Sequence, residues 1–160
     1  MHRFLAFTLV TFVTSAPLAA QTATATLSAD LGAVAKLSFS STTLSFADAD
    51  PDALAQIPAT GGPITITAKA RAAQGQVVLT VLANGNPRSG VNTLPADAFT
   101  WTATGAGFVG GTVSATAPQV VGSWTGSGVR VGSQTFLFRN SWSYMAGVYS
   151  MTLTYTLTTP

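Results

Sequence analysis

The segment Tyr149–Leu157, with the sequence YSMTLTYTL, alternates bulky apolar or aromatic side chains with serine and threonine over its whole length. Successive side chains of a β-strand point to opposite faces, so this period predicts a strand with one face in a core and the other in water. At about 3.3 Å per residue it would extend over about 30 Å, the length of a full strand. The bulky face consists of Tyr149, Met151, Leu153, Tyr155 and Leu157.

Segments with the same period recur along the chain, separated by turn-forming residues such as those of Asn84–Pro87. They are 22–29, 34–39, 43–47, 63–71, 76–82, 99–104, 112–116, 120–124 and 134–139. Strands spaced by roughly 8–12 residues with turns between them are typical of sandwiches and barrels. We therefore predict an all-β fold, a single antiparallel β-sandwich, with 76–82 as a central strand and residues 51–56 as its only short helical turn.

The first twenty residues have the layout of a secretory signal peptide. Met1–Arg3 is basic, Phe4–Val13 is apolar, and Thr14–Ala20 contains a proline and small residues. The apolar stretch is too short for a membrane-spanning helix, which needs about 20 residues. We expect a signal peptide over 1–20, export through the general secretory pathway, and a secreted or cell-surface β-sandwich domain over 21–160 that does not insert into a membrane.

Charged residues make up only 8% of the chain, and all five acids are aspartates. The apolar content of 47% excludes a disordered chain, which would show the opposite balance. Without residues 1–20, six basic residues face five acidic ones, a net charge of +1. No basic cluster is larger than Lys69 with Arg71, which argues against nucleic acid as a partner. The chain contains no cysteine, so neither a disulfide nor a lipidated N-terminal cysteine is available.

The groups that most enzymes use are missing, because residues 21–160 contain no histidine, cysteine or glutamate. This excludes Ser-His-Asp and Cys-His nucleophiles and imidazole or thiolate metal sites. A Ser-x-x-Lys motif is also missing, because Ala33 and Ile66 stand three residues before Lys36 and Lys69. We expect no enzymatic activity, no catalytic residues and no bound cofactor.

Asp48, Asp50 and Asp52 are weak candidates for a metal site, because alternate carboxylates can converge on a hard cation such as Ca²⁺. An EF-hand is excluded, since Ala53 and Ala59 stand where that motif has glycine and glutamate. The favoured interpretation is a solvated turn in which aspartate side chains accept hydrogen bonds from backbone N–H groups.

The aromatic side chains are a second candidate site, since exposed rings can stack on sugars. These residues are Trp101, Trp124, Trp142, Tyr144, Tyr149 and Tyr155. Most of them alternate with polar neighbours, so we expect them in the core. Trp124 stands between Ser123 and Thr125 in a glycine-rich stretch, and we expect it to be partly exposed and the possible glycan contact.

The C-terminal motif Ala146–Tyr149 (AGVY), followed by an alternating strand close to the last residue, resembles the ending of secreted bacterial Ig-like subunits. The opening TATATLSADL of residues 22–31 and the LSF of Leu44–Phe46 are similar to the start of the same domains. These include spore coat protein U-type proteins, other chaperone–usher pilin subunits and related exported domains. The resemblance implies an Ig-like β-sandwich that is a non-enzymatic structural or adhesive cell-surface protein, pilin-like in assembly, with other protein subunits or a cell-envelope polymer as partners.

Tyr155–Pro160 is also similar to the distal motif of WxL cell-wall-binding domains, although the proximal W-x-L is missing. The alternative function is therefore a cell-wall or glycan-binding module of the WxL or carbohydrate-binding type. Whether residues 22–31 act as a donor strand in a neighbouring subunit is open, because alanine stands at most of their inward positions and fills space poorly. The same segment can equally be the first strand of its own domain.

Overall fold

The computed structural model describes residues 24–160, which fall into a short segment up to Asp30 and a unit from Leu31 to Pro160. Residues 24–30 contain no helix or strand and are all exposed. The expectation of a strand over 22–29 is therefore wrong for the residues described, because an alternating pattern forms a strand only where a neighbour pairs with its backbone. The expected signal peptide, residues 1–20, lies outside the described residues.

The unit from Leu31 to Pro160 is all-β, and the part of the chain described contains no α-helix. A single 3-10 turn, η1, covers Ala96–Ala98. The strands are β1 (Val34–Phe39), β2 (Ser45–Phe46), β3 (Gln56–Thr60), β4 (Ile64–Arg71), β5 (Gln76–Ala83), β6 (Arg88–Ser89), β7 (Asn92–Thr93), β8 (Phe99–Thr104), β9 (Gly111–Thr112), β10 (Gln119–Thr125), β11 (Gly128–Arg139) and β12 (Leu153–Thr158).

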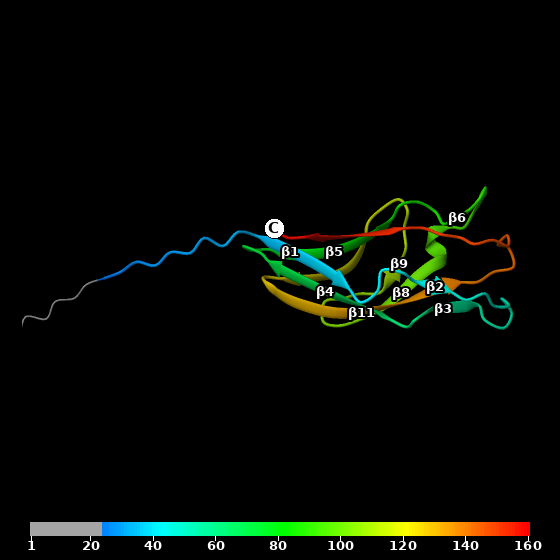
Figure 1. Cartoon of the computed structure of the whole chain (residues 1–160), viewed down its shortest axis with the longest axis horizontal. Coiled ribbons are helices and arrows are strands. Elements are labelled where there is room, and N and C mark those ends of the chain that lie inside the picture. Colours follow the sequence, from blue (N-terminus) through cyan, green and yellow to red (C-terminus); the bar gives the residue numbers. More distant parts are fainter. Residues whose placement is uncertain (1–23) are drawn as a thin grey trace, which may run out of the picture. The chain divides into compact units, whose positions relative to one another are not determined.

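The larger sheet has seven strands and is built on the long strand β11 (Figure 1). The first part of β11 pairs with β4, and its last residues pair with β3 on the same side. On its other side β11 pairs with β8, which in turn pairs with the short β9. Strands β1 and β2 pair with β4 and β3 and form the outer edge. All of these pairs are antiparallel, as expected.

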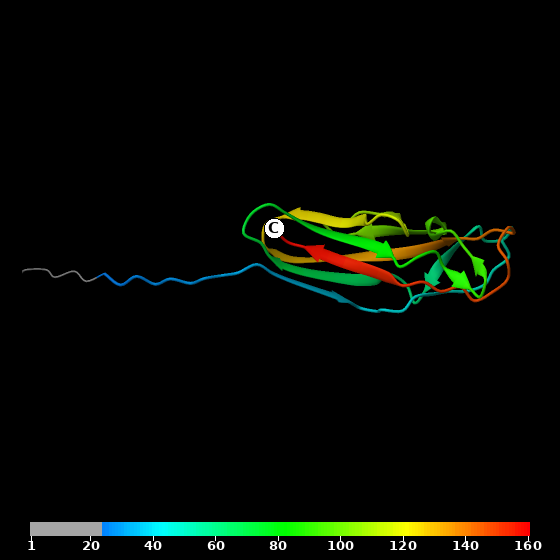
Figure 2. The same cartoon turned by 90° about the horizontal axis from the view of Figure 1, so that it is seen from above.

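The smaller sheet has the order β10-β5-β12 and is also antiparallel. Strand β5 is central, which confirms the prediction for 76–82, and its inward side chains Val77, Leu79 and Val81 are fully buried. In Figure 2, β12, drawn in red, lies alongside β5. The pair β6 and β7 forms a separate two-stranded ribbon.

The two larger sheets share one hydrophobic core. Ile66 and Ala68 of β4 contribute to it from one sheet, and Leu79 of β5 contributes from the other. Burial of a side chain as large as Ile66 or Leu79 contributes about 1.5–3 kcal/mol. Aromatic rings extend the core toward one end, with Phe99 stacked on Phe138 at 4.8 Å between ring centroids and Phe46 edge-on to Phe99 at 5.3 Å.

The C-terminal strand differs in two respects from the expectation. The alternation is confirmed from Leu153 to Thr158, but the strand begins at Leu153 and not at Tyr149. Its apolar side chains are half-buried, not buried. The reason is that β12 is an edge strand, so one flank of each inward side chain has no neighbour in the sheet.

Two shorter predictions are also resolved. Of the segment 112–116 only Thr112 belongs to a strand, so that expectation is wrong in length. The expected helical turn near 51–56 is a single turn, in which the carbonyl oxygen of Asp50 accepts hydrogen bonds from the N–H groups of Ala53 (3.1 Å) and Leu54 (2.8 Å). Strand β3 then begins at Gln56.

Candidate functional site

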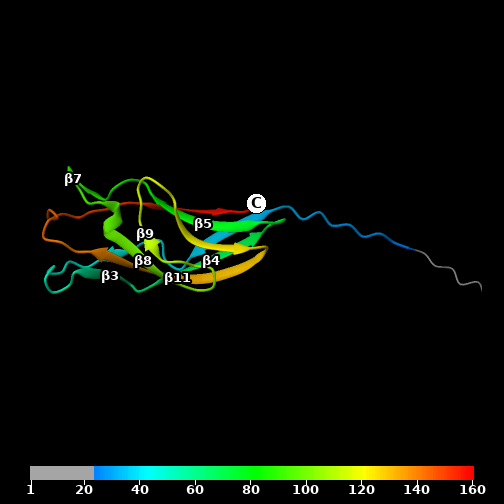
Figure 3. The ribbon, with the colours of Figure 1, turned by 180° about the vertical axis from the view of Figure 1, so that it is seen from behind.

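On one side of the two-sheet unit, the segment of residues 107–112 bonds to the edge strands of both sheets and closes this side. Strand β9 pairs with β8 of the larger sheet (Figure 3). A few residues earlier, the N–H of Val109 donates to the carbonyl oxygen of Val121 (2.8 Å), and the N–H of Ser123 donates to Gly107 (2.8 Å). Residues 107–112 therefore occupy the edges of both β8 and β10.

Gly107 is required for this closure. Its φ of +83° is a conformation that L side chains rarely adopt, and a Cβ at this position would lie 2.8 Å from the carbonyl oxygen of Ser123. A glycine in this place lets the segment approach the backbone of β10 closely enough to bond to it.

The opposite side is different, because β1 and β12 each pair with one neighbour only. Asn84, which follows β5, donates its N–H to the carbonyl oxygen of Thr152 (2.9 Å), whereas the N–H of Ala83 points away from β12 and donates to Ser114 (2.9 Å). Antiparallel pairs alternate between bonded and non-bonded residues. In β12, the backbone groups of Leu153, Tyr155 and Leu157 therefore face away from β5. Within the described chain, no strand lies beside these groups.

We call the adjoining edges of β1 and β12 the open edge, and its side chains are half-buried and apolar. They are Leu37, Phe39, Leu153, Tyr155 and Leu157. Two of them cross between the sheets, since the rings of Phe39 and Tyr155 lie 4.8 Å apart. Edge strands are normally protected by lysine, proline or a bulge, and β12 has none of these between Leu153 and Thr158.

Tyr155 is fixed by a hydrogen bond within the core. Its hydroxyl donates to Oε1 of Gln134 at 2.6 Å, and burial raises the pKa of this phenol well above its ordinary value. Gln134 is fully buried on β11, and its Nε2 has no hydrogen-bond partner. A buried amide without hydrogen bonds is costly. The Tyr155 hydroxyl pairs the amide oxygen of Gln134 and leaves its amide nitrogen unpaired.

The three aspartates lie in the loop of residues 47–55, which we call the aspartate loop. Oδ1 of Asp50 accepts a hydrogen bond from the N–H of Asp52 (2.9 Å), as the turn interpretation expects. Oδ1 of Asp52 accepts one from Nε1 of Trp142 (3.1 Å). Asn140 fixes the loop by donating to the carbonyl oxygens of Ala49 (2.8 Å) and Leu54 (3.3 Å). Among residues 24–160, no three acidic, histidine or cysteine side chains gather closely enough to hold a metal ion.

The expectation for Trp124 is wrong. Its side chain is only 7% exposed, lies on the inward face of β10 and packs on Phe108 with 5.8 Å between ring centroids. The nearby glycines allow close approach of the segment at Gly107, which covers the ring. A ring this buried has no free face for a sugar.

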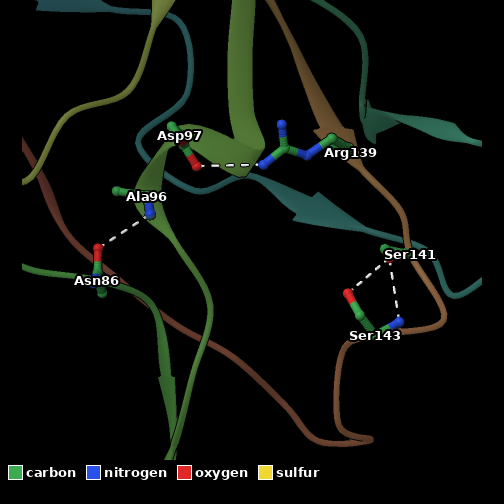
Figure 4. Close-up of polar contacts among 6 residues, drawn as sticks. All are labelled: Asn86, Ala96, Asp97, Arg139, Ser141 and Ser143. Atoms are coloured by element: carbon green, nitrogen blue, oxygen red, sulfur yellow. Dashed lines mark hydrogen bonds and ion pairs between the residues drawn. The ribbon is translucent and has the colours of Figure 1, made fainter.

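Trp142 is the exposed tryptophan, at 69%; sequence reasoning named it among the aromatic candidates but singled out Trp124 instead. The available signal was its position between Ser141 and Ser143, outside any alternating segment. The hydroxyls of these serines bond to each other at 2.8 Å (Figure 4), and the indole between them is exposed.

A shallow polar depression of about 360 Å³ lies near this end of the unit, lined by Asn84, Gly85, Asn86, Arg88, Ser150, Met151 and Thr152. Its amides serve the fold: Oδ1 of Asn86 accepts from the N–H of Ala96 at 3.1 Å (Figure 4), and Oδ1 of Asn84 accepts from the N–H of Thr152 at 2.9 Å. Both amide oxygens are therefore part of the fold and are not free for a ligand.

No protein-family model matches this sequence, and a comparison with curated proteins found no significant match. Over the residues that the structure describes, no helix has the length and apolar character needed to cross a membrane.

Proposed function

We propose that this chain is an exported, non-enzymatic structural subunit of the cell surface that assembles when an extended segment of one copy adds to the β12 edge of another. The observation that carries the proposal is the unpaired edge of β12, which lacks the usual protection of an edge strand and is bordered by half-buried apolar side chains.

The strand order supports an Ig-like sandwich with one place unfilled. Immunoglobulin-type domains pair strands A-B-E-D in one sheet and C-F-G in the other. Here β1-β4-β11-β8 corresponds to the first set, and β5-β12 corresponds to C-F. No strand among the described residues occupies the position of G, which is the free edge of β12.

Residues 22–31 have the pattern that this position requires. Their odd-numbered positions are alanine or leucine, and their even-numbered positions are threonine, serine or aspartate. In the structure Leu27 is 93% exposed and Leu31 is 68% exposed, so both would gain from burial. Alanine at the other apolar positions suits this edge, because Phe39 and Tyr155 of the acceptor already fill the space between the sheets.

Strand addition is a recognised way of gaining affinity from main-chain hydrogen bonds and specificity from alternate side chains. Each bond contributes about 0.5–1.5 kcal/mol net, and burial of Leu27 adds about 1.5–3 kcal/mol. These gains are opposed by the cost of ordering the donor, about 1–2 kcal/mol per residue, so the apolar side chains that the donor buries along Leu153–Thr158 decide the strength of the junction.

The test compares Leu27→Asp with Thr26→Asp in the exported chain, since these neighbours lie on opposite faces of an extended segment. Size-exclusion chromatography and negative-stain microscopy should show oligomers or filaments for the unmodified chain and for Thr26→Asp, and monomers for Leu27→Asp. A chain that stays monomeric at high concentration, or that assembles equally well with Leu27→Asp, would show that this segment is not donated.

A second candidate function is glycan binding, which the exposed indole of Trp142 favours. Asp52 holds the ring by the hydrogen bond to Nε1 while most of the ring faces solvent. Such a fixed aromatic face can stack on a sugar. Binding to isolated cell-wall polysaccharide that is lost in Trp142→Ala but retained in Tyr149→Phe would establish this function.

A further inference from the structure

Three exposed cations of the Leu31–Pro160 unit lie together at one of its ends. Lys36, Lys69 and Arg71, which we call the basic patch, project from the outer face of the larger sheet where β1 begins and β4 ends. All three are exposed, and Arg71 is held there because its Nε donates to the carbonyl oxygen of Gly32 (2.7 Å). Among residues 24–160 the only ion pair is that of Arg139 with Asp97 (Figure 4), so the basic patch has no carboxylate partner.

The basic patch is unfavourable in an isolated chain. Lys36 and Lys69 stand directly opposite each other in the β1–β4 pair, and like charges in this position destabilise a sheet. Val129 and Val131 lie on the same face of the adjoining strand β11, and both are more than half exposed. A surface that binds an acidic partner carries cations for the charge attraction and exposed aliphatic side chains for apolar contact, and this face carries both.

The acidic groups lie at the other end of the unit. The aspartate loop carries Asp48, Asp50 and Asp52, all exposed, and Asn140 ties this loop to the end of β11. The basic patch lies near the start of β11, about 40 Å away for a 12-residue strand. Figure 1 shows the start of β1 and the loop before β3 at opposite ends.

Strand addition to β12 would bring the basic patch of one copy close to the aspartate loop of another. This step rests on the proposed function. Every strand pair in residues 24–160 is antiparallel, so we take the donor to be antiparallel to β12. Such a donor runs in the direction of β5 and β11, from the Gly128 end of the acceptor to the Arg139 end. An extended segment of residues 24–33 spans about 33 Å, most of the length of β11. The donor's own β1 therefore begins beside the acceptor's aspartate loop.

We propose that the basic patch of each donating copy binds the aspartate loop of the accepting copy, so that the partner of this surface is a second copy of the same chain. The contact is heterologous, which produces an open head-to-tail filament and not a closed dimer. Opposite charges at such a junction mainly accelerate association and fix its orientation. They also relieve the repulsion between Lys36 and Lys69.

The test measures the assembly rate of the exported chain by light scattering at low and high salt. Lys69→Glu and Asp48→Lys should each slow assembly by about tenfold or more at low salt, and the difference should disappear at high salt. A chain that carries both substitutions should recover most of the rate, because the two charges have been exchanged. Arg88→Glu is the matched control: it changes the net charge as Lys69→Glu does, but it lies outside the basic patch and should not slow assembly.

The outcomes separate this inference from the function on which it rests. If the unmodified chain assembles and Leu27→Asp does not, but Lys69→Glu behaves like Arg88→Glu, the junction is wrong and strand addition stands. Failure of the double variant to recover would likewise overturn the pairing of the basic patch with the aspartate loop. If the unmodified chain does not assemble at all, strand addition fails and the junction fails with it.

Discussion

The hydrogen bond between Tyr155 and Gln134 gives the most direct test of how β12 is held. Tyr155→Phe removes the hydroxyl that donates to Oε1 of Gln134 at 2.6 Å and leaves the ring contact with Phe39 in place. Because Nε2 of Gln134 is already unpaired, the whole amide of a fully buried side chain then lacks a partner. The expected loss in the free energy of unfolding is about 1–3 kcal/mol, a large part of the typical 5–15 kcal/mol.

A second substitution isolates the cause of that loss. Gln134→Met in the Tyr155→Phe background removes both unpaired polar atoms and keeps a side chain of similar length. The double variant should therefore be more stable than Tyr155→Phe alone by about 1 kcal/mol or more. Urea denaturation measures the free energies, and thermal unfolding should show a difference of about 2–6 °C per kcal/mol.

A Tyr155→Phe chain as stable as the unmodified chain would contradict this account of the Gln134 amide. That result would mean that the Gln134 amide is satisfied by water, and that the interior beneath β12 is not dry. A double variant less stable than Tyr155→Phe would refute it as well, since removal of unpaired polar atoms would then have cost stability.

Three further predictions concern the same fold. The raised pKa of Tyr155 means that the folded chain keeps this proton when the unfolded chain has lost it, so stability should fall as the pH rises above about 10; the fall in melting temperature should be smaller in Tyr155→Phe. Leu153→Ala should cost about 1–3 kcal/mol, because this side chain is half-buried, whereas Thr154→Ala on the wet face should cost about 0.5 kcal/mol or less; equal losses would contradict the observed register. Gly107→Ala should cost about 2 kcal/mol or more through its φ of +83° and its contact with Ser123, as measured by urea denaturation, and an unchanged midpoint would show that this segment does not hold β10.

Sequence reasoning predicted the elements whose side-chain period is long and regular. In β5 the apolar run is continuous, and in β12 apolar and polar side chains alternate. Both patterns indicate a strand without knowledge of the neighbouring strands, because successive side chains of a strand point to opposite faces. The antiparallel all-β class follows from the spacing of these segments and the turns between them. Local pattern is sufficient for these features because it depends only on the chain itself.

The depth of burial could not be predicted in the same way. Leu153 and Leu157 have the pattern of core residues, but they are half-buried because β12 lies at an edge. Trp124 stands in a glycine-rich stretch typical of a loop, but the segment at Gly107 covers it. Both outcomes depend on which strands are neighbours, and sequence order does not determine that.

The candidate sites show the same distinction. The turn at Asp50 was predicted because an aspartate side chain commonly accepts a hydrogen bond from the backbone N–H two residues later, and this interaction is local. Trp142 was not singled out as the exposed tryptophan, because its position depends on Asp52, ninety residues away along the chain. The open edge depends on which backbone groups of β12 face β5, and this requires the three-dimensional register.

The half-buried side chains of the open edge connect assembly to folding stability. A strand added along β12 would cover Leu153 and Leu157 and would pair backbone groups that have no strand beside them. Any ligand that binds only the folded chain raises its stability, by about 2.7 kcal/mol at a concentration of 100 times its dissociation constant.

The peptide TATATLSADL, residues 22–31, should therefore raise the melting temperature of the Leu27→Asp chain, which cannot supply this strand itself. The same peptide with aspartate at the position of Leu27 is the control and should have no effect. If both peptides leave the melting temperature unchanged, β12 does not accept this strand and the half-burial of its side chains is merely the ordinary state of an edge.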